Sequence, residues 1–102
     1  RGFVLEGTDL RTDVDITPWE AALGTELDVA TLSGRVTLKV TAGTQSHQVL
    51  RLRGLGLPQT ATRKGDLLVR VRIVIPETLS DDERRLFEEL AKTSPFRPRG
   101  DD

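Results

Sequence analysis

The feature that most constrains the fold of this chain is a two-residue period of aliphatic side chains in its longest apolar stretch. In "DLLVRVRIVIP", residues 66–76, every second residue from Leu67 to Ile75 is aliphatic, and Arg70 and Arg72 lie between them. Side chains of a β-strand point alternately to opposite faces, so this pattern predicts a strand with one apolar face. Such a face must be covered by another layer of structure.

The same alternation recurs in four shorter stretches of the chain, and turn-forming residues separate them. The stretches are residues 9–16, 26–29, 35–40 and 49–53. Short one-sided strands with regular turns are typical of two sheets packed face to face. We therefore expect a mainly β protein, a small antiparallel β-sandwich with one short internal helix and a C-terminal amphipathic helix.

The internal helix is predicted by "TPWEAALG", residues 17–24. Thr17 is a suitable N-cap, Glu20 completes a capping box, and Gly24 favours the left-handed conformation that ends many helices. A helix this short is unstable by itself and needs tertiary packing. We expect its Trp19, Ala22 and Leu23 to close one end of the sandwich.

The C-terminal helix is predicted to begin at "LSDDERRLFEELAK". Ser80 is the expected N-cap and Glu83 stands at the box position. An apolar stripe at helical spacing follows, formed by Leu86, Phe87, Leu90 and Ala91. Such a helix packs either on its own sandwich or on a second copy, and the spacing does not separate these alternatives. We place the domain boundary between residues 1–78 and 79–102.

Charge is distributed unevenly along the 102 residues, although the net charge is −1. Residues 1–34 carry seven acids and two bases, residues 35–75 carry eight bases and one acid, and residues 76–102 carry eight acids and five bases. A basic middle segment is compatible with a nucleic-acid-binding module that uses residues 35–75. The favoured interpretation is pairing of acidic strands with basic ones, because the segment lacks aromatic residues for base stacking.

Candidate catalytic, metal and cofactor sites are weak, so we expect a non-enzymatic protein without a cofactor. Gly54 and Gly56 lack the third glycine of a dinucleotide loop and the Gly-Lys-Ser/Thr of a P-loop, and they indicate a sharp bend instead. The one histidine, His47, suits a solvated turn. Two acidic pairs, at 13 and 15 and at 26 and 28, fit either a hard cation or, preferably, a solvated strand face. Zinc and calcium spacings are absent, as is cysteine.

The compartment is constrained by what the sequence lacks. It contains no signal peptide and no apolar run long enough to span a bilayer. We therefore expect a cytoplasmic protein without a membrane partner.

Five motifs in order resemble the C-terminal β-domains of DnaJ-family J-domain co-chaperones. They are "GTDL", "ITPWEAALGTELDVATLSGRVTLKV", "AGTQSHQVLRLRGLGLP", "KGDLLVRVRIVIPETLSDDER" and "FRPR", and together they cover nearly the whole chain. The closing helix and tail resemble the second of the two β-domains in this family. "PWEAALG" and the tail are most similar to the zinc-free branch that resembles curved-DNA-binding protein.

The resemblance implies a stress-response chaperone role: a homodimeric holdase that delivers unfolded client polypeptides to a DnaK-type chaperone. Residues 1–78 are then a client-binding-type β-sandwich, and residues 79–102 are a dimerisation helix and tail. The family's dimer contacts map onto Leu86, Phe87 and Leu90, together with Phe96. A weaker expectation is peptide binding at apolar residues that the strand pattern leaves outside the core, namely Leu55, Leu57, Leu68 and Val74.

The chain departs from the family pattern at three points. The His-Pro-Asp motif of the J-domain is absent, since Gln48 follows His47, so this segment should not stimulate an ATPase. Leu55 stands where the family commonly has lysine in a "G-K-G" bend. His47 replaces a common glycine, and histidine tolerates a positive φ better than most residues.

Overall fold

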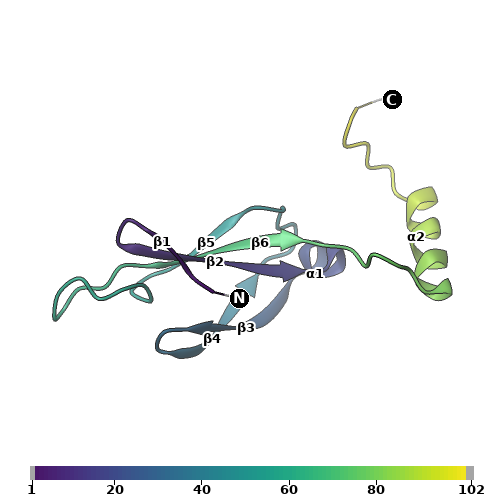
Figure 1. The fold of residues 1–102 in the computed structure, drawn as a ribbon. Coiled ribbons are helices and arrows are strands. Elements are labelled where there is room, and N and C mark those ends of the chain that lie inside the picture. The colour runs from purple at the N-terminus through teal and green to yellow at the C-terminus, as the bar shows by residue number, and fades with distance from the viewer. Residues whose placement is uncertain (1, 101–102) are drawn as a thin grey trace.

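The computed structural model describes residues 2–100, which form six strands and two helices (Figure 1). In chain order the elements are β1 (Val4–Glu6), β2 (Asp9–Ile16), α1 (Pro18–Leu23), β3 (Thr25–Thr31), β4 (Gly34–Val40), β5 (Val49–Leu52), β6 (Leu67–Ile73) and α2 (Asp81–Thr93). One sheet has the strand order β1-β2-β6-β5, and β3 pairs with β4 in a second sheet. The predicted mainly β class, with a C-terminal helix, is confirmed.

The core lies where the inner faces of the two sheets meet. Its buried apolar side chains are Leu10 and Ile16 on β2, Ala21 on α1, Val29 on β3, Leu38 and Val40 on β4, and Leu67, Val69 and Val71 on β6. The strand residues among them are members of the apolar faces that the alternation predicts. Burial of these faces is the main stabilising contribution, because apolar surface is removed from water in proportion to its area.

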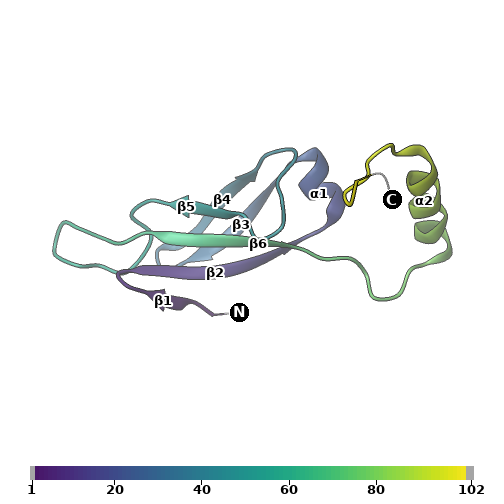
Figure 2. The same cartoon turned by 90° about the horizontal axis from the view of Figure 1, so that it is seen from above.

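The central pair of strands is parallel, which differs from the expected all-antiparallel arrangement. β2 pairs with β6 from Leu10 opposite Leu67 to Ile16 opposite Ile73, whereas β1-β2, β3-β4 and β5-β6 are antiparallel. A parallel pair needs a long crossover connection. Residues 17–66, which include α1, the β3-β4 hairpin and β5, supply it (Figure 2). The alternation within one strand does not specify the direction of its neighbour.

The strands differ from the sequence pattern at two places, an additional strand β1 and the end of β6. β1 was not predicted, because it is a three-residue edge strand whose residues are all exposed. β6 ends at Ile73, and Ile75, which the alternation assigned to the inner face, is 66% exposed. The neighbouring strand β2 ends at Ile16, which lies opposite Ile73. The last hydrogen bond between the two strands runs from the Val74 N–H to the Ile16 carbonyl, and after it the chain leaves the sheet.

Helix α1 has the predicted ends but buries a different residue. The Thr17 hydroxyl accepts a hydrogen bond from the Glu20 N–H, the Glu20 carboxylate accepts one from the Thr17 N–H, and Gly24 has φ +88°. Ala21 is buried against the core. The residues expected to close one end of the sandwich are instead exposed, namely Trp19, Ala22 and Leu23. The reason is that α1 is only six residues long, so a single narrow face reaches the core.

The two glycines of "RGLGLP" form a bend, as predicted, rather than a phosphate-binding loop. Gly54 has φ +75°, and the Gly56 N–H donates to the Gly65 carbonyl at 2.9 Å. A Cβ atom on Gly56 would lie 2.4 Å from the Asp66 carbonyl oxygen. Glycine is therefore required here by the close approach of two backbone segments.

Helix α2 stands apart from the β-sandwich at the end of an extended connection (Figures 1 and 2). The molecule measures 56 × 30 × 20 Å, and its radius of gyration is 17.3 Å. A compact domain of about 100 residues has a radius of gyration near 13 Å. The excess comes from α2 and the tail, which extend the long axis of the molecule.

Candidate functional site

The apolar stripe of α2 faces a hollow between the two helices. Leu86, Phe87 and Leu90 line it from α2, and Trp19 lines it from α1. Glu83 lies at the same hollow, whose volume is about 360 Å³. Leu86 and Leu90 remain 55% and 60% exposed, and Phe87 is half-buried. Three of the four expected dimerisation residues are thus gathered in one place.

Trp19 is the residue that sequence analysis missed. It lies in the first turn of α1, is 47% exposed, and lines the hollow together with the α2 stripe. The capping pattern located α1 correctly, but it did not show which side of the helix meets the core. The sequence did contain one signal. Trp19 and Leu23 are four residues apart, so they lie on the same face of α1, and this face is exposed.

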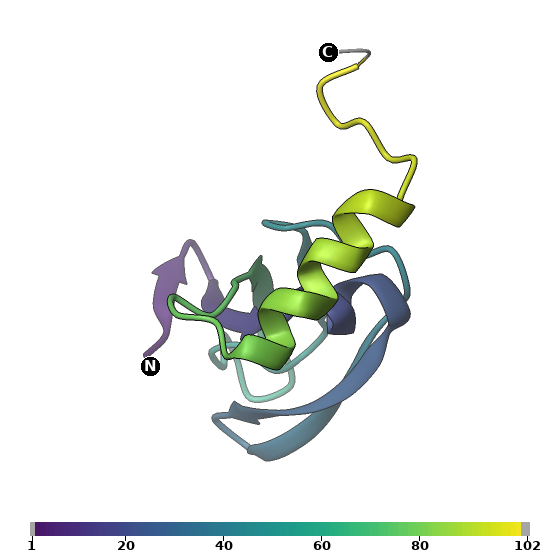
Figure 3. The same ribbon diagram turned by 90° about the vertical axis from the view of Figure 1, so that its right-hand side faces the viewer.

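Phe96, the fourth expected dimerisation residue, lies outside the hollow. It is 74% exposed in the segment that follows α2. A local turn fixes this segment: the Phe96 N–H donates to the Ser94 hydroxyl at 3.2 Å, and Arg97 donates to the carbonyls of Ser94 and Phe96. Figures 1 and 3 show the tail continuing beyond the C-terminal end of α2, and Figure 2 shows that it turns back toward the side of α1.

The four residues expected to bind peptide do not share one surface. Leu68 lies on the outer face of β6, opposite Arg11 and Arg51 of the neighbouring strands. Leu55 packs against the core from the glycine bend, and Leu57 follows it in the same loop. Val74 lies beyond the other end of β6, about 20 Å from Leu68 at the rise of a β-strand. A role for each in peptide binding stays a prediction.

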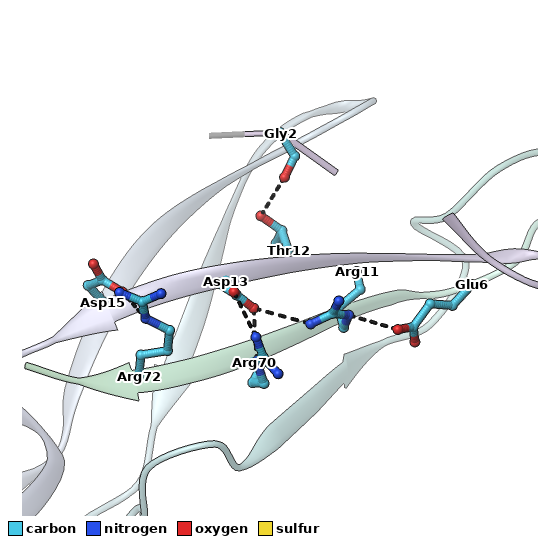
Figure 4. Close-up of polar contacts among 8 residues, drawn as sticks. All are labelled: Gly2, Glu6, Arg11, Thr12, Asp13, Asp15, Arg70 and Arg72. Carbon is cyan, nitrogen blue, oxygen red and sulfur yellow. Dashed lines mark hydrogen bonds and ion pairs between the residues drawn. The ribbon is translucent and has the colours of Figure 1, made fainter. Parts of the chain in front are cut away.

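Ion pairs cross the outer face of the larger sheet in register (Figure 4). Arg70 donates two hydrogen bonds of 3.0 Å to the Asp13 carboxylate, and Arg72 pairs with Asp15 at 2.9 Å. The pairing of acidic with basic strands is therefore as predicted, and each of these two aspartates is paired with an arginine. Neutralised arginines leave less positive charge for nucleic acid, and nucleic-acid binding by residues 35–75 stays a prediction.

Comparison with known proteins assigns this chain to a protein family. The model of the family described as "DnaJ C terminal domain" matches residues 1–76. The chain belongs to the DnaJ C-terminal domain family.

Relatives of this DnaJ C-terminal domain are similar over nearly all of its length. Curved DNA-binding protein of Coxiella burnetii is 42% identical over 97 residues, which are 95% of this chain and 30% of that protein. Chaperone protein DnaJ of Roseiflexus castenholzii is 42% identical over 99 residues, 96% of this chain and 27% of that protein. Chaperone protein DnaJ of Thermotoga petrophila is 47% identical over 91 residues, 88% and 25% of the two chains. The chain thus spans less than a third of the length of these relatives.

The histidine of the DnaJ C-terminal domain has a structural place in a turn. His47 is exposed, has φ +71°, and donates its backbone N–H to the Val71 carbonyl at 2.7 Å, so it is a turn residue as predicted. Among residues 2–100, no three His, Asp or Glu side chains are grouped so that they would hold a metal ion. Within the same part of the chain, no helix is long and apolar enough to cross a membrane.

The loop that follows the glycine bend is tied to the sheet by one carboxylate. Asp66 accepts a hydrogen bond from the Gly54 N–H at 2.9 Å and pairs with Arg51. These contacts, the Gly54 bond first, lower the pKa of Asp66 below 3.8. The Asp66 N–H in turn donates to Asp9 at 2.8 Å, which links the loop to the start of β2. This network explains the single acid within the basic middle segment.

Proposed function

We propose that this DnaJ C-terminal domain is the self-associating part of a DnaJ-type co-chaperone. In this proposal it joins two copies of the protein and helps to hold unfolded client polypeptides for transfer to a DnaK-type chaperone. It does so without catalysing a reaction. The observation that carries the proposal is helix α2, which stands off the sandwich with its apolar stripe uncovered.

An uncovered stripe on a 13-residue helix indicates a missing partner. Isolated helices of this length are marginal in water, and tertiary packing of the apolar face normally stabilises them. Here the sandwich contributes chiefly Trp19 to the hollow on α2. A second copy is the simplest partner, because a two-fold axis lets the same stripe cover itself.

Self-association also gives a physical advantage to a protein that holds clients. Two weak sites on one dimer convert the second binding event into an intramolecular one, so avidity rises without new contacts. The J-domain motif is absent from this sequence, and the relatives are more than three times as long. Activation of a DnaK-type ATPase is therefore assigned to another part of the longer protein.

The test replaces two stripe residues by charge. Phe87→Asp combined with Leu90→Asp places carboxylates in the apolar contact, where an unpaired charge is strongly disfavoured. We expect sedimentation equilibrium to show a dimer for the parent chain and a monomer for the double variant. The matched control is Leu32→Asp at the β3-β4 turn, since Leu32 is 55% exposed like Leu86 but lies far from α2.

Two results would contradict the proposal. One is a parent chain that stays monomeric at every concentration measured. The other is a dimer whose mass is unchanged by the double variant, which would place the interface elsewhere. A loss of the dimer in the Leu32→Asp control as well would show that surface charge in general, rather than the stripe, controls association.

A further inference from the structure

We propose that a hairpin at the end of the sandwich opposite α2 binds an extended acidic polypeptide segment that also carries aliphatic side chains. The hairpin comprises residues 56–65 and is here called the finger. Its contact residues are Leu57, Gln59 and Arg63. This surface is separate from the apolar stripe of α2, so the inference goes beyond the proposed self-association and does not depend on it.

The finger is a hydrogen-bonded projection with a fixed base. The Gly65 N–H donates to the Leu57 carbonyl at 2.7 Å, and the Gln59 N–H donates to the Arg63 carbonyl at 2.8 Å. A Cβ atom on Gly65 would overlap the Thr8 carbonyl oxygen, so the base lies directly against the turn before β2. Figures 1 and 2 show the finger extending from the end of the sandwich opposite α2. A surface that is already ordered loses little conformational entropy when it binds a ligand.

Each face of the finger combines a cation with an apolar side chain. Pro58 and Lys64 are partners in an antiparallel bridge, so their side chains share one face. The alternation along paired strands then places Leu57, Gln59 and Arg63 together on the other face. All five of these residues are exposed, so both faces are accessible to a ligand.

The cations of the finger lack the carboxylate partners that the arginines of the larger sheet have. Each sheet arginine pairs with an aspartate or glutamate, namely Arg11, Arg51, Arg70 and Arg72. Among residues 2–100, Arg63 and Lys64 form no ion pair, and neither does Arg53 at the base of the finger. Residues 53–65 contain these three bases and no acid. A ligand that carries carboxylates is complementary to this charge, which favours its approach and selects it over basic segments.

The apolar part of the finger favours a polypeptide over a nucleic acid. Leu57 is 36% exposed and lies on the same face as Arg63. Residues 53–65 contain no aromatic side chain on which a base would stack. A polypeptide can offer an aliphatic side chain and a carboxylate together, and the Leu57 face presents a partner for each.

The spacing of Leu57 and Arg63 fits an extended ligand. Arg63 lies opposite Gln59, and Leu57 lies two residues before Gln59, so Leu57 and Arg63 are diagonal neighbours across the hairpin. Diagonal neighbours are about 7–8 Å apart. Side chains two positions apart on an extended chain are separated by about 6.4–6.8 Å. The finger therefore fits a segment in which an aspartate or glutamate stands two positions from an aliphatic residue.

Fluorescence anisotropy with three labelled probes tests the inference. The probes are a peptide of repeated Leu-Ser-Glu-Ser units, the same peptide with glutamine in place of glutamate, and an oligothymidylate. We expect the parent chain to bind the glutamate peptide and to bind the glutamine peptide roughly 10-fold more weakly, because the charged hydrogen bonds are lost. Affinity for the glutamate peptide should fall as the salt concentration rises.

Variants of the finger locate the binding site. Arg63→Ala combined with Lys64→Ala should raise the dissociation constant of the glutamate peptide roughly 10- to 100-fold. Leu57→Ser should also weaken binding, but it should leave the salt dependence unchanged. The matched control is Arg84→Ala combined with Arg85→Ala, which removes two adjacent exposed cations from α2. It should leave the affinity unchanged, and all of these side chains lie outside the buried core, so the variants should fold.

Three results would overturn the inference. One is a parent chain that does not bind the glutamate peptide at any concentration measured. Another is binding that the finger variants leave unchanged. The third is an oligothymidylate that binds more tightly than the glutamate peptide and is lost in the same variants, because the finger would then belong to nucleic acid.

The same titration in the Phe87→Asp, Leu90→Asp double variant separates this inference from the proposed function. We expect an unchanged affinity per chain, because the finger lies at the other end of the molecule. A loss of binding in that variant would place the peptide on the α2 stripe and overturn the finger site. A parent chain that stays monomeric but binds the glutamate peptide through the finger supports this inference and contradicts the proposed self-association alone.

Discussion

Asp13 lies on the outer face of β2, and two guanidinium groups approach its carboxylate. Arg70 donates to both carboxylate oxygens at 3.0 Å, and Arg11 lies 3.6 Å from one of them (Figure 4). The hydrogen bonds from Arg70 are the main cause that lowers the pKa of Asp13 below 3.8. Paired, two-point contact of this kind is the strongest geometry for an ion pair at a partly exposed site.

This ion pair predicts a pH-dependent contribution to stability. A carboxyl group whose pKa is lower in the folded than in the unfolded protein stabilises the fold above its unfolded pKa, and the contribution is lost as the pH falls through the folded pKa. We expect Asp13→Asn to lower the thermal midpoint at pH 7, and the difference from the parent to shrink as the pH falls below about 4. Thermal denaturation followed by circular dichroism between pH 2 and pH 7 measures it.

The control for this prediction is Asp28→Asn on β3. The Asp28 carboxylate accepts a hydrogen bond of 3.4 Å from the Thr37 hydroxyl, so this substitution does not remove a two-point contact with arginine. A difference between Asp13→Asn and the parent that stays constant from pH 7 to pH 2 would show that the ionised carboxylate is not the source.

Helices α1 and α2 have the same capping box but different surroundings. The effect of removing each N-cap can therefore be compared between the two helices. The Thr17 hydroxyl accepts from the Glu20 N–H at 3.1 Å, and the Ser80 hydroxyl accepts from the Glu83 N–H at 3.1 Å. Helix α1 anchors Ala21 in the core, whereas α2 stands off the sandwich. Loss of the α1 cap should therefore destabilise the sandwich, and loss of the α2 cap should not.

We expect Thr17→Ala to lower the free energy of unfolding by about 1 kcal/mol. That loss corresponds to a fall of about 4–8 °C in the thermal midpoint of a domain of this size. Ser80→Ala, measured in the monomeric Phe87→Asp, Leu90→Asp background, should leave the midpoint nearly unchanged and reduce only the helical signal. Equal falls in both variants would mean that α2 is part of the same cooperative unit as the sandwich.

The individual strands and helices show which features of the fold the sequence pattern predicts. Alternation placed the inner faces of β2 and β6 correctly, because burial on one face imposes a period of two on each strand. It missed β1, whose exposed residues carry no such period. The parallel β2-β6 pair and the face of α1 depend on contacts between distant segments, so Ala21 rather than Trp19 became the buried residue. The stripe of α2 was identified, but its Trp19 neighbour required the three-dimensional structure.

At the scale of the whole molecule, the sandwich and α2 are distinct parts. The buried apolar side chains of the described chain lie between Leu10 and Val71, and the residues of α2 are exposed or half-buried. The family model likewise ends at residue 76. The sandwich should therefore contain all of the stabilising core, while α2 and the tail contribute association.

A chain ended after Thr78 tests this division and the proposed boundary between residues 1–78 and 79–102. We expect it to fold, to sediment as a monomer, and to unfold cooperatively with a midpoint within about 8 °C of the monomeric double variant, the shift that about 1 kcal/mol produces at this size. Trp19 should emit at longer wavelength than in the parent dimer, because the α2 side of its hollow is gone. Circular dichroism, sedimentation and fluorescence on the same sample measure the three expectations. A shortened chain without a cooperative transition would show that α2 stabilises the sandwich itself, and the separation of core from association would then be wrong.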